Sequence, residues 1–444
     1  MRNKFSLFFS SKNVNSRNNI HVKLMNSLRF LLVFLLFFPA LVFSQANYDE
    51  SKVPGFKLPD PLISFRQRKI RNVKQWEKTR RPELHDFFTK NMYGEIPGKL
   101  EISSFNILEQ GDDAFNGKAK RRQVELTFEK GKHKIHFNIL MYLPKGVEKA
   151  PLFLGYNFSG NHSVASDPHI LISTAWVEDN PSLGIINNQF TEQSRGAKTN
   201  RWAIEKMLDA GFGLATIYYG EVDPDKEDYS DGVQPFFYVD DQKKPADNEW
   251  GSVAVWAWGL SRAMDYLEQD QDVDAQKVIV FGHSRLGKTA LWAGVNDQRF
   301  AGVISNDSGC GGAALSKREF GETIKLINTS FPHWFCKNFK NYSGNEKALP
   351  VDQHEVLAMI APRPLYVASA EDDQWADPGG EFLSVVYASP VYKLYGVQGI
   401  TQTEMPAVNQ PVMGPVAYHI RSGKHDVTEF DWEQYIRWAK QYIQ

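Results

Sequence analysis

One short segment near the middle of the chain constrains the fold more than any other. Residues 278–281 read Val-Ile-Val-Phe, four apolar and mostly β-branched side chains that predict a buried strand. Residues 290–293, Ala-Leu-Trp-Ala, already have a helical composition. The residues between them, Gly282 to Ser284, must therefore make a sharp turn from strand to helix. A serine on such a turn projects from the backbone, with the N–H groups of the helix start behind it. Ser284 is thus the candidate nucleophile.

The glycine spacing of this segment differs from the usual pattern. A nucleophile elbow commonly reads Gly-x-Ser-x-Gly. Here Leu286 occupies the place of the second glycine, and Gly287 follows one residue late. The short motif alone is therefore weak evidence for a catalytic serine.

Length and charge exclude some classes of function. The chain has 444 residues, 42% of them hydrophobic, which suffices for one large or two ordinary domains. Residues 1–44 hold six of the 51 Lys and Arg residues and none of the 52 Asp and Glu residues, so the remainder carries 45 basic and 52 acidic residues, a net of −7. A mildly acidic protein has no electrostatic reason to bind nucleic acid or an anionic membrane.

The N-terminal region has the features of an export signal. Residues 30–43 form an apolar run that is short for a membrane span, and Lys23 and Arg29 precede it. We expect residues 1–44 to be a leader and a cleavable signal peptide, with Met25 as the true start, and the protein to be periplasmic or secreted. An uncleaved N-terminal anchor is the alternative.

The remaining chain alternates buried strands with helices. Strands are expected over 101–110, 121–144, 151–156, 213–219, 278–281, 302–305 and 364–369, and helices over 63–90, 202–209, 253–267 and 431–443. This alternation predicts an α/β fold with a mostly parallel central sheet between two helical layers, a three-layer sandwich. We expect an N-terminal extension over 45–110 packed on the body, and a catalytic domain over 111–444. The polar segment 163–200 is long enough to be an insertion at a cleft.

A catalytic serine needs a base and a carboxylate that orients the base. In α/β hydrolases the chain order is nucleophile, acid, histidine. Of the histidines downstream of Ser284, His425 lies in a glycine-bearing loop just before the last helix, where this order places the base. His419 falls in an expected strand, so a buried structural role suits it better. His425 is the predicted base.

Two acids compete to orient His425. Asp307 follows one expected strand and Asp373 follows the next, and both loops lie at the carboxyl ends of parallel strands, where sites of this architecture gather. Either aspartate can also be a turn former. These residues alone do not decide between them.

Two basic residues flank the serine. Lys288 is four residues after Ser284 on the same expected helix, so both side chains share a face. Its ammonium group can donate to a sugar hydroxyl, although an exposed lysine is the simpler interpretation. Arg285 places its backbone N–H, and its guanidinium, where an oxyanion would form.

Together these residues resemble the glucuronoyl esterases, carbohydrate esterase family fifteen, in their bacterial branch. The resemblance rests on several segments, namely Gly282-His283-Ser284-Arg285-Leu286-Gly287-Lys288, Ser305-Asn306-Asp307-Ser308-Gly309-Cys310-Gly311-Gly312, Phe320-Gly321-Glu322, Trp375-Ala376-Asp377-Pro378 and Gly423-Lys424-His425-Asp426. The first resembles the Gly-x-Ser-Arg-x-Gly-Lys elbow of the family and accounts for the displaced glycine.

The resemblance implies an α/β-hydrolase fold and assigns roles to residues. It implies that Ser284 is the nucleophile, His425 the base and Arg285 the side chain of the oxyanion site. It further implies that three residues hold the hydroxyls of a glucuronate ring, namely Lys288, Glu322 and Trp375. Without it, Glu322 would be read as a solvated helix residue and Trp375 as a core aromatic.

The chain departs from the family at position 307, where many relatives carry Glu and this chain has Asp. Some bacterial members place the acid after the next strand, which Asp373 would match. We therefore expect Asp373 to orient His425 at least in part, with Asp307 as the second candidate. Residues 171–199 resemble the cleft-side insertions of the bacterial branch.

The implied activity is a serine esterase that cleaves the ester between glucuronic or 4-O-methylglucuronic acid of xylan and lignin alcohols, through an acyl-enzyme. The alternatives are an acetyl xylan or other carbohydrate esterase, and a secreted carbohydrate-binding protein without turnover. We expect no metal and no organic cofactor, and a monomer. Cys310 and Cys336 either form a disulfide or remain buried free thiols.

Overall fold

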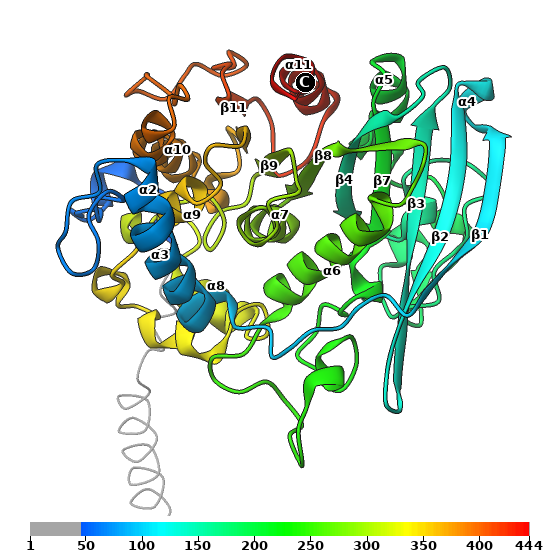
Figure 1. The fold of residues 1–444 in the computed structure, drawn as a ribbon, viewed down its shortest axis with the longest axis horizontal. Helices are drawn as coiled ribbons and strands as arrows, with labels where there is room; N and C mark the ends of the chain where they lie inside the picture. The colour runs from blue at the N-terminus through cyan, green and yellow to red at the C-terminus, as the bar shows by residue number, and fades with distance from the viewer. Residues whose placement is uncertain (1–45, 444) are drawn as a thin grey trace, which may run out of the picture. The chain divides into compact units, whose positions relative to one another are not determined.

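A nine-stranded sheet runs through the protein (Figure 1). The computed structural model describes residues 46–443. The strands follow one another across the sheet in the order β1-β2-β3-β7-β4-β8-β9-β10-β11. Their bounds are β1 Ser104–Asp113, β2 Ala119–Lys130, β3 His133–Pro144, β4 Ala150–Asn157, β7 Gly213–Tyr218, β8 Val273–His283, β9 Gly302–Asn306, β10 Leu365–Ala370 and β11 Val416–Arg421.

The sheet is antiparallel at one edge and parallel elsewhere. Strands β1, β2, β3 and β7 pair antiparallel, whereas β7, β4, β8, β9, β10 and β11 pair parallel. The predicted mostly parallel α/β sheet is confirmed. Two short strands, β5 (Ile185–Ile186) and β6 (Gln189–Phe190), form a separate hairpin within the expected insertion.

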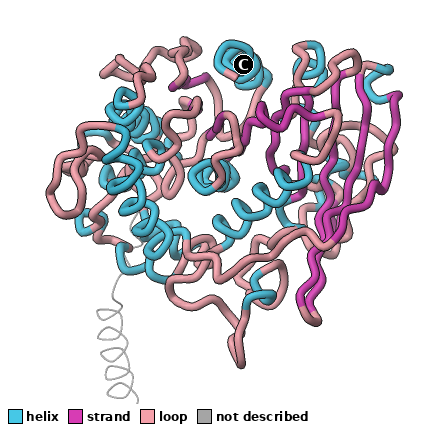
Figure 2. The backbone as a smooth tube through the Cα atoms, viewed as in Figure 1, coloured by secondary structure: helices cyan, strands magenta, loops and turns pink. Residues whose placement is uncertain are grey.

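Helices cover both faces of the sheet, as Figures 1 and 2 show. Side chains of β8 alternate between two hydrophobic clusters: Val278 and Val280 pack in one, Ile279 and Phe281 in the other. The first cluster includes residues of α3, α6, α7, α9 and α10, and the second includes residues of α5 and α11. A strand buried on both faces has the continuous apolar sequence from which it was predicted.

The expected helices over 253–267 and 431–443 match Ser252–Leu267 and Glu429–Tyr442 closely, whereas Ile324–Ser330, Gln353–Ala358 and Pro378–Leu394 were not predicted. The helices are α2 Val73–Gln75, α3 Arg81–Phe88, α4 Ala114–Gly117, α5 Ile204–Asp209, α6 Ser252–Leu267, α7 Arg285–Asn296, α8 Ile324–Ser330, α9 Gln353–Ala358, α10 Pro378–Leu394 and α11 Glu429–Tyr442. Within residues 46–443, no helix combines the length and the apolar character needed to cross a bilayer.

The segment predicted as an N-terminal extension packs against helices of the body. The Nη2 atom of Arg80 donates to Glu355 Oε1 at 2.5 Å, and both side chains are buried. The ring of Tyr93 stacks on Trp292 of α7 with centroids 4.1 Å apart. The predicted boundary between residues 110 and 111 falls inside β1, so the end of the extension belongs to the sheet. The expected signal peptide lies outside the described residues.

Of the two alternatives left open for the cysteines, the structure shows the free thiols, because Cys310 and Cys336 are both free and buried. The Sγ atom of Cys336 lies 3.8 Å from the carbonyl oxygen of Lys90, toward the N-terminal segment. Cys310 instead lies in the field of Lys288 and Glu322, and burial holds the pKa of its thiol well above the usual range. The two thiols thus face different surroundings, and the alternative of two free thiols holds.

Candidate active site

Ser284 stands at a strained turn between β8 and α7. Its backbone has φ 59° and ψ −130°, a conformation that residues other than glycine adopt only at a cost in free energy. The Ser284 N–H donates to the carbonyl oxygen of Asn306 on β9 at 2.9 Å, which holds the turn in place. This is the local geometry that the sequence predicted.

The displaced glycine has a steric explanation. A Cβ atom on Gly282 would lie 1.8 Å from the carbonyl oxygen of Leu286, so the strand end can carry no side chain. A Cβ atom on Gly287 would lie 2.9 Å from Ser308 Cβ and 3.2 Å from the carbonyl oxygen of Gly282. The first helical turn therefore packs against the turn before it through positions 282 and 287, and Leu286 remains free to enter the core.

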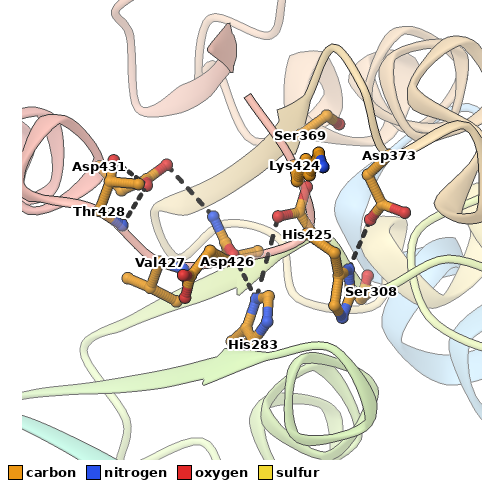
Figure 3. A network of polar contacts seen from close by, with 12 residues as sticks. His283, Ser308, Ser369, Asp373, Lys424, His425, Asp426, Val427, Thr428 and Asp431 are labelled. Carbon is orange, nitrogen blue, oxygen red and sulfur yellow. Dashed lines mark hydrogen bonds and ion pairs between the residues drawn. The ribbon is translucent and has the colours of Figure 1, made fainter. Parts of the chain in front are cut away.

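His425 lies in the loop between β11 and α11 and contacts Asp373 (Figure 3). Its Nδ1 atom is 2.5 Å from Asp373 Oδ2. The imidazole is 40% exposed, whereas the Asp373 side chain is 5% exposed. A buried carboxylate at Nδ1 favours the tautomer whose Nε2 atom is free to accept a proton. His425 and Ser284 line the same cavity.

Asp307 is close to this pair but has different partners. Its Oδ2 atom lies 3.4 Å from Arg421 Nη2, and its buried Oδ1 atom has no hydrogen-bond partner among the described residues. Burial, together with the nearby carboxylates of Glu381 and Asp373, holds the pKa of Asp307 well above its usual range. Its surroundings thus disfavour the charged form of Asp307, and it is Asp373 that contacts His425.

Ligand atoms of Asp307, Asp373 and His425 all lie within 4.8 Å of one another. Carboxylates and an imidazole are a donor set that a divalent cation accepts. In this structure Asp373 and His425 instead form a short hydrogen bond with each other, an arrangement that suits proton transfer.

Arg285 begins α7, where backbone N–H groups have no partner within the helix. Its Nη1 atom donates to Asp225 Oδ2 at 2.6 Å, and its guanidinium lies over the Trp334 ring, 4.8 Å from the centroid. The Phe158 ring, from the loop after β4, is 5.5 Å from the same guanidinium.

The residues expected to bind a sugar lie together in the cavity that Ser284 lines. Lys288 Nζ donates to the Ser308 carbonyl oxygen at 2.6 Å and lies 3.4 Å from Glu322 Oε2. Burial raises the pKa of the Glu322 carboxyl, and the Lys288 charge opposes that rise. The Glu322 N–H donates to the Trp375 carbonyl oxygen at 2.9 Å. Trp375 is 38% exposed, so it is not the core aromatic that would be expected without the family resemblance.

All eight predicted site residues line one open cavity with a volume of about 320 Å³. The complete lining is Ser284, Arg285, Lys288, Asp307, Ser308, Gly309, Glu322, Phe331, Trp334, Asp373, Trp375, Ala376 and His425. This volume lies at the lower end of the range for small-molecule sites. By contrast, His419 is buried and bonded to Asp431 at 2.9 Å, as expected of a structural histidine.

Asp225, Phe331 and Trp334 were not identified from the sequence. Asp225 follows β7 at its carboxyl end, so the rule that selected Asp307 and Asp373 could have selected it too. Phe331 and Trp334 lie beyond α8 and belong to no motif.

Comparisons with known proteins agree with this geometry. A family model described as glucuronyl esterase of fungi matches residues 198–396. The chain is 47% identical over 399 residues to a carbohydrate esterase from an unknown prokaryotic organism, which covers 89% of this chain and 92% of that protein. It is 33% identical over 196 residues to a 4-O-methyl-glucuronoyl methylesterase of Phanerochaete carnosa, covering 42% of this chain and 47% of that protein.

Solved structures give the same result. A promiscuous CE15 esterase from a marine bacterial metagenome superposes with a TM-score of 0.84 at 47% identity, over 89% of this chain and all of that one. The glucuronoyl esterase of Solibacter usitatus superposes with a TM-score of 0.83 at 46% identity, over 88% of this chain and 99% of that one.

Proposed function

Because the chain belongs to the glucuronoyl esterases, carbohydrate esterase family 15, we propose that it hydrolyses esters of glucuronic or 4-O-methylglucuronic acid with lignin-type alcohols. One observation carries the proposal. The cavity that holds Ser284 and the Asp373–His425 pair is also lined by Lys288, Glu322 and Trp375. A nucleophile with its base thus shares a hollow with groups suited to sugar hydroxyls.

The proposed reaction proceeds through an acyl-enzyme. His425 removes the proton of the Ser284 hydroxyl, whose oxygen attacks the C6 carbonyl of the uronate ester. The Arg285 N–H and guanidinium stabilise the oxyanion that develops. His425 then passes its proton to the alcohol, which leaves. Water, deprotonated by the same imidazole, attacks the acyl-serine and releases the glucuronate.

The sugar is recognised beside the reacting carbonyl. Lys288 offers donors, Glu322 offers acceptors, and the exposed Trp375 offers an indole N–H and an apolar face. Since Lys288 and Glu322 are buried together, a substrate that lacks ring hydroxyls would exclude water without offering partners to their remaining hydrogen-bonding groups. Simple acetate esters should therefore be poor substrates.

A direct assay tests the proposal. Purified protein should hydrolyse benzyl glucuronate much faster than it releases acetate from acetylated xylan, and Ser284→Ala should abolish both activities. Equal rates on the two substrates would favour the alternative of a general carbohydrate esterase. Failure of a fluorescent fluorophosphonate to label Ser284 would favour a binding protein without turnover.

We further propose that a signal peptide in residues 1–44 directs export of the protein. We also propose that the mature protein is a monomer. The apolar run over 30–43 with its basic flank supports export. N-terminal sequencing of protein recovered from the periplasm and the medium tests the cleavage, and light scattering of the mature protein tests the oligomeric state.

A further inference from the structure

Asp225 accepts a hydrogen bond from the guanidinium of Arg285, the candidate oxyanion residue. Its Oδ2 atom accepts from Arg285 Nη1 at 2.6 Å and from the Tyr219 hydroxyl at 3.0 Å. Its Oδ1 atom accepts from His333 Nε2 at 2.8 Å and from the Trp334 indole N–H at 2.7 Å. Both carboxylate oxygens are thus fixed by donors from three separate segments of the chain.

The surroundings keep Asp225 charged. Its side chain is 11% exposed, and burial alone would raise its pKa. Hydrogen bonds from His333 and Trp334 and the charge of Arg285 outweigh the burial, so the pKa of Asp225 is lowered to about 2. These contacts therefore favour the charged form of Asp225 beside Arg285.

The Asp225–Arg285 ion pair does not use every N–H group of the guanidinium. Arg285 Nε is buried and has no hydrogen-bond partner among the described residues. Leaving a buried donor of this kind unpaired costs free energy unless a ligand satisfies it. The aromatic rings of Trp334, Phe331 and Phe158 surround the guanidinium at 4.8, 5.8 and 5.5 Å from their centroids, which limits its rotamers.

We infer that Asp225 is a positioning residue for catalysis. It fixes Arg285 through Nη1 so that the remaining N–H groups face the oxyanion of the tetrahedral intermediate. This inference rests on the proposed esterase function, because it assigns the support of a group in that mechanism. A preorganised donor needs no rearrangement when the charge develops, which is the source of its catalytic effect.

A double-mutant cycle tests the inference. The variants are Asp225→Asn, Arg285→Ala and their combination, and the matched control is Asp228→Asn, on the same loop but paired with Lys226 at 3.1 Å. Asp225→Asn should lower kcat by roughly 10- to 100-fold with little change in KM, below the loss for removing an oxyanion donor. In the Arg285→Ala background the same substitution should lower kcat less than about threefold. The control should match the parent.

Other results would overturn the inference. If Asp225→Asn lowers kcat equally with and without Arg285, Asp225 acts only on the fold. The same conclusion follows if a distant substitution that lowers Tm by the same amount also lowers kcat by the same factor. Asp225→Asn with parental kcat would also refute it.

The cycle is run on both benzyl glucuronate and p-nitrophenyl acetate. If the parent cleaves only the acetate, the proposed substrate is wrong while the coupling between Asp225 and Arg285 is still measured.

Discussion

Replacing each of the two candidate acids by asparagine should have very different effects on turnover. Asp373 lies 2.5 Å from His425 Nδ1 and is buried, so Asp373→Asn replaces a charge-assisted hydrogen bond by a neutral one. If the amide nitrogen faces the ring, the imidazole must also adopt the tautomer that cannot accept the Ser284 proton. We expect kcat to fall by roughly 10²- to 10⁴-fold.

Asp307→Asn should be much milder. Because burial and nearby carboxylates hold the pKa of Asp307 well above its usual range, the amide resembles the favoured, uncharged form of this side chain in charge and shape. The interaction that changes most is the contact with Arg421 Nη2 at 3.4 Å, and Arg421 retains Asp431 at 2.8 Å. We expect less than about a tenfold loss of kcat, equivalent to roughly 1.4 kcal/mol.

The assay is steady-state hydrolysis of benzyl glucuronate from about pH 5 to pH 9, with thermal unfolding of each variant as the control for folding. The reasoning is refuted if Asp307→Asn loses more activity than Asp373→Asn while both variants unfold at the parental temperature. In that case Asp307 would be the charged acid during turnover. Its raised pKa would then describe only the enzyme without substrate.

Three further predictions concern the sugar site, a buried glutamate and the cysteines. Lys288→Ala should raise KM for benzyl glucuronate about tenfold or more, while a fluorophosphonate still labels Ser284; loss of labelling would place Lys288 in the chemistry instead. Burial raises the pKa of Glu381 from about 4.5 to about 7, so the folded state binds a proton that the unfolded state releases, and stability should fall as pH rises through this window by up to about 3 kcal/mol. Glu381→Gln should flatten that fall in Tm measured against pH, and an unchanged slope would assign it to another group. A reducing agent should leave Tm unchanged, because Cys310 and Cys336 are not bonded; a lower Tm would show a disulfide.

The sequence predicted those parts of the site that depend on local order. Ser284 could be found because a strand, a turn and a helix follow one another within a few residues, and His425 because its loop precedes the last helix. Strands β1 to β4 and β7 to β10 followed from alternating patterns and apolar runs, whereas β11 was given no expected range. These features require no knowledge of which distant segments meet.

The parts that were missed depend on contacts between distant segments. Asp225 supports Arg285 through donors at positions 219, 333 and 334, and no spacing in the sequence connects these positions. Residue patterns alone did not decide between Asp307 and Asp373 either, because both follow strands of the same sheet, and the expectation of Asp373 rested on the family resemblance. The choice depends on side-chain direction, and the Asp307 backbone, with φ 44°, turns its carboxylate toward Arg421.

The charges of the cavity fit a neutral ester better than the acid that hydrolysis produces. Both basic side chains of the lining lie beside carboxylates, Arg285 at 2.6 Å from Asp225 and Lys288 at 3.4 Å from Glu322. Asp373 adds a further carboxylate without an arginine or lysine partner among the described residues. An incoming uronate ester carries no charge, so it meets hydrogen-bond donors without competing for a salt bridge. The glucuronate product is an anion, and the Asp373 carboxylate, which has no Lys or Arg partner among the described residues, repels it. We therefore expect the proposed glucuronate product to bind this cavity more weakly than the neutral ester does.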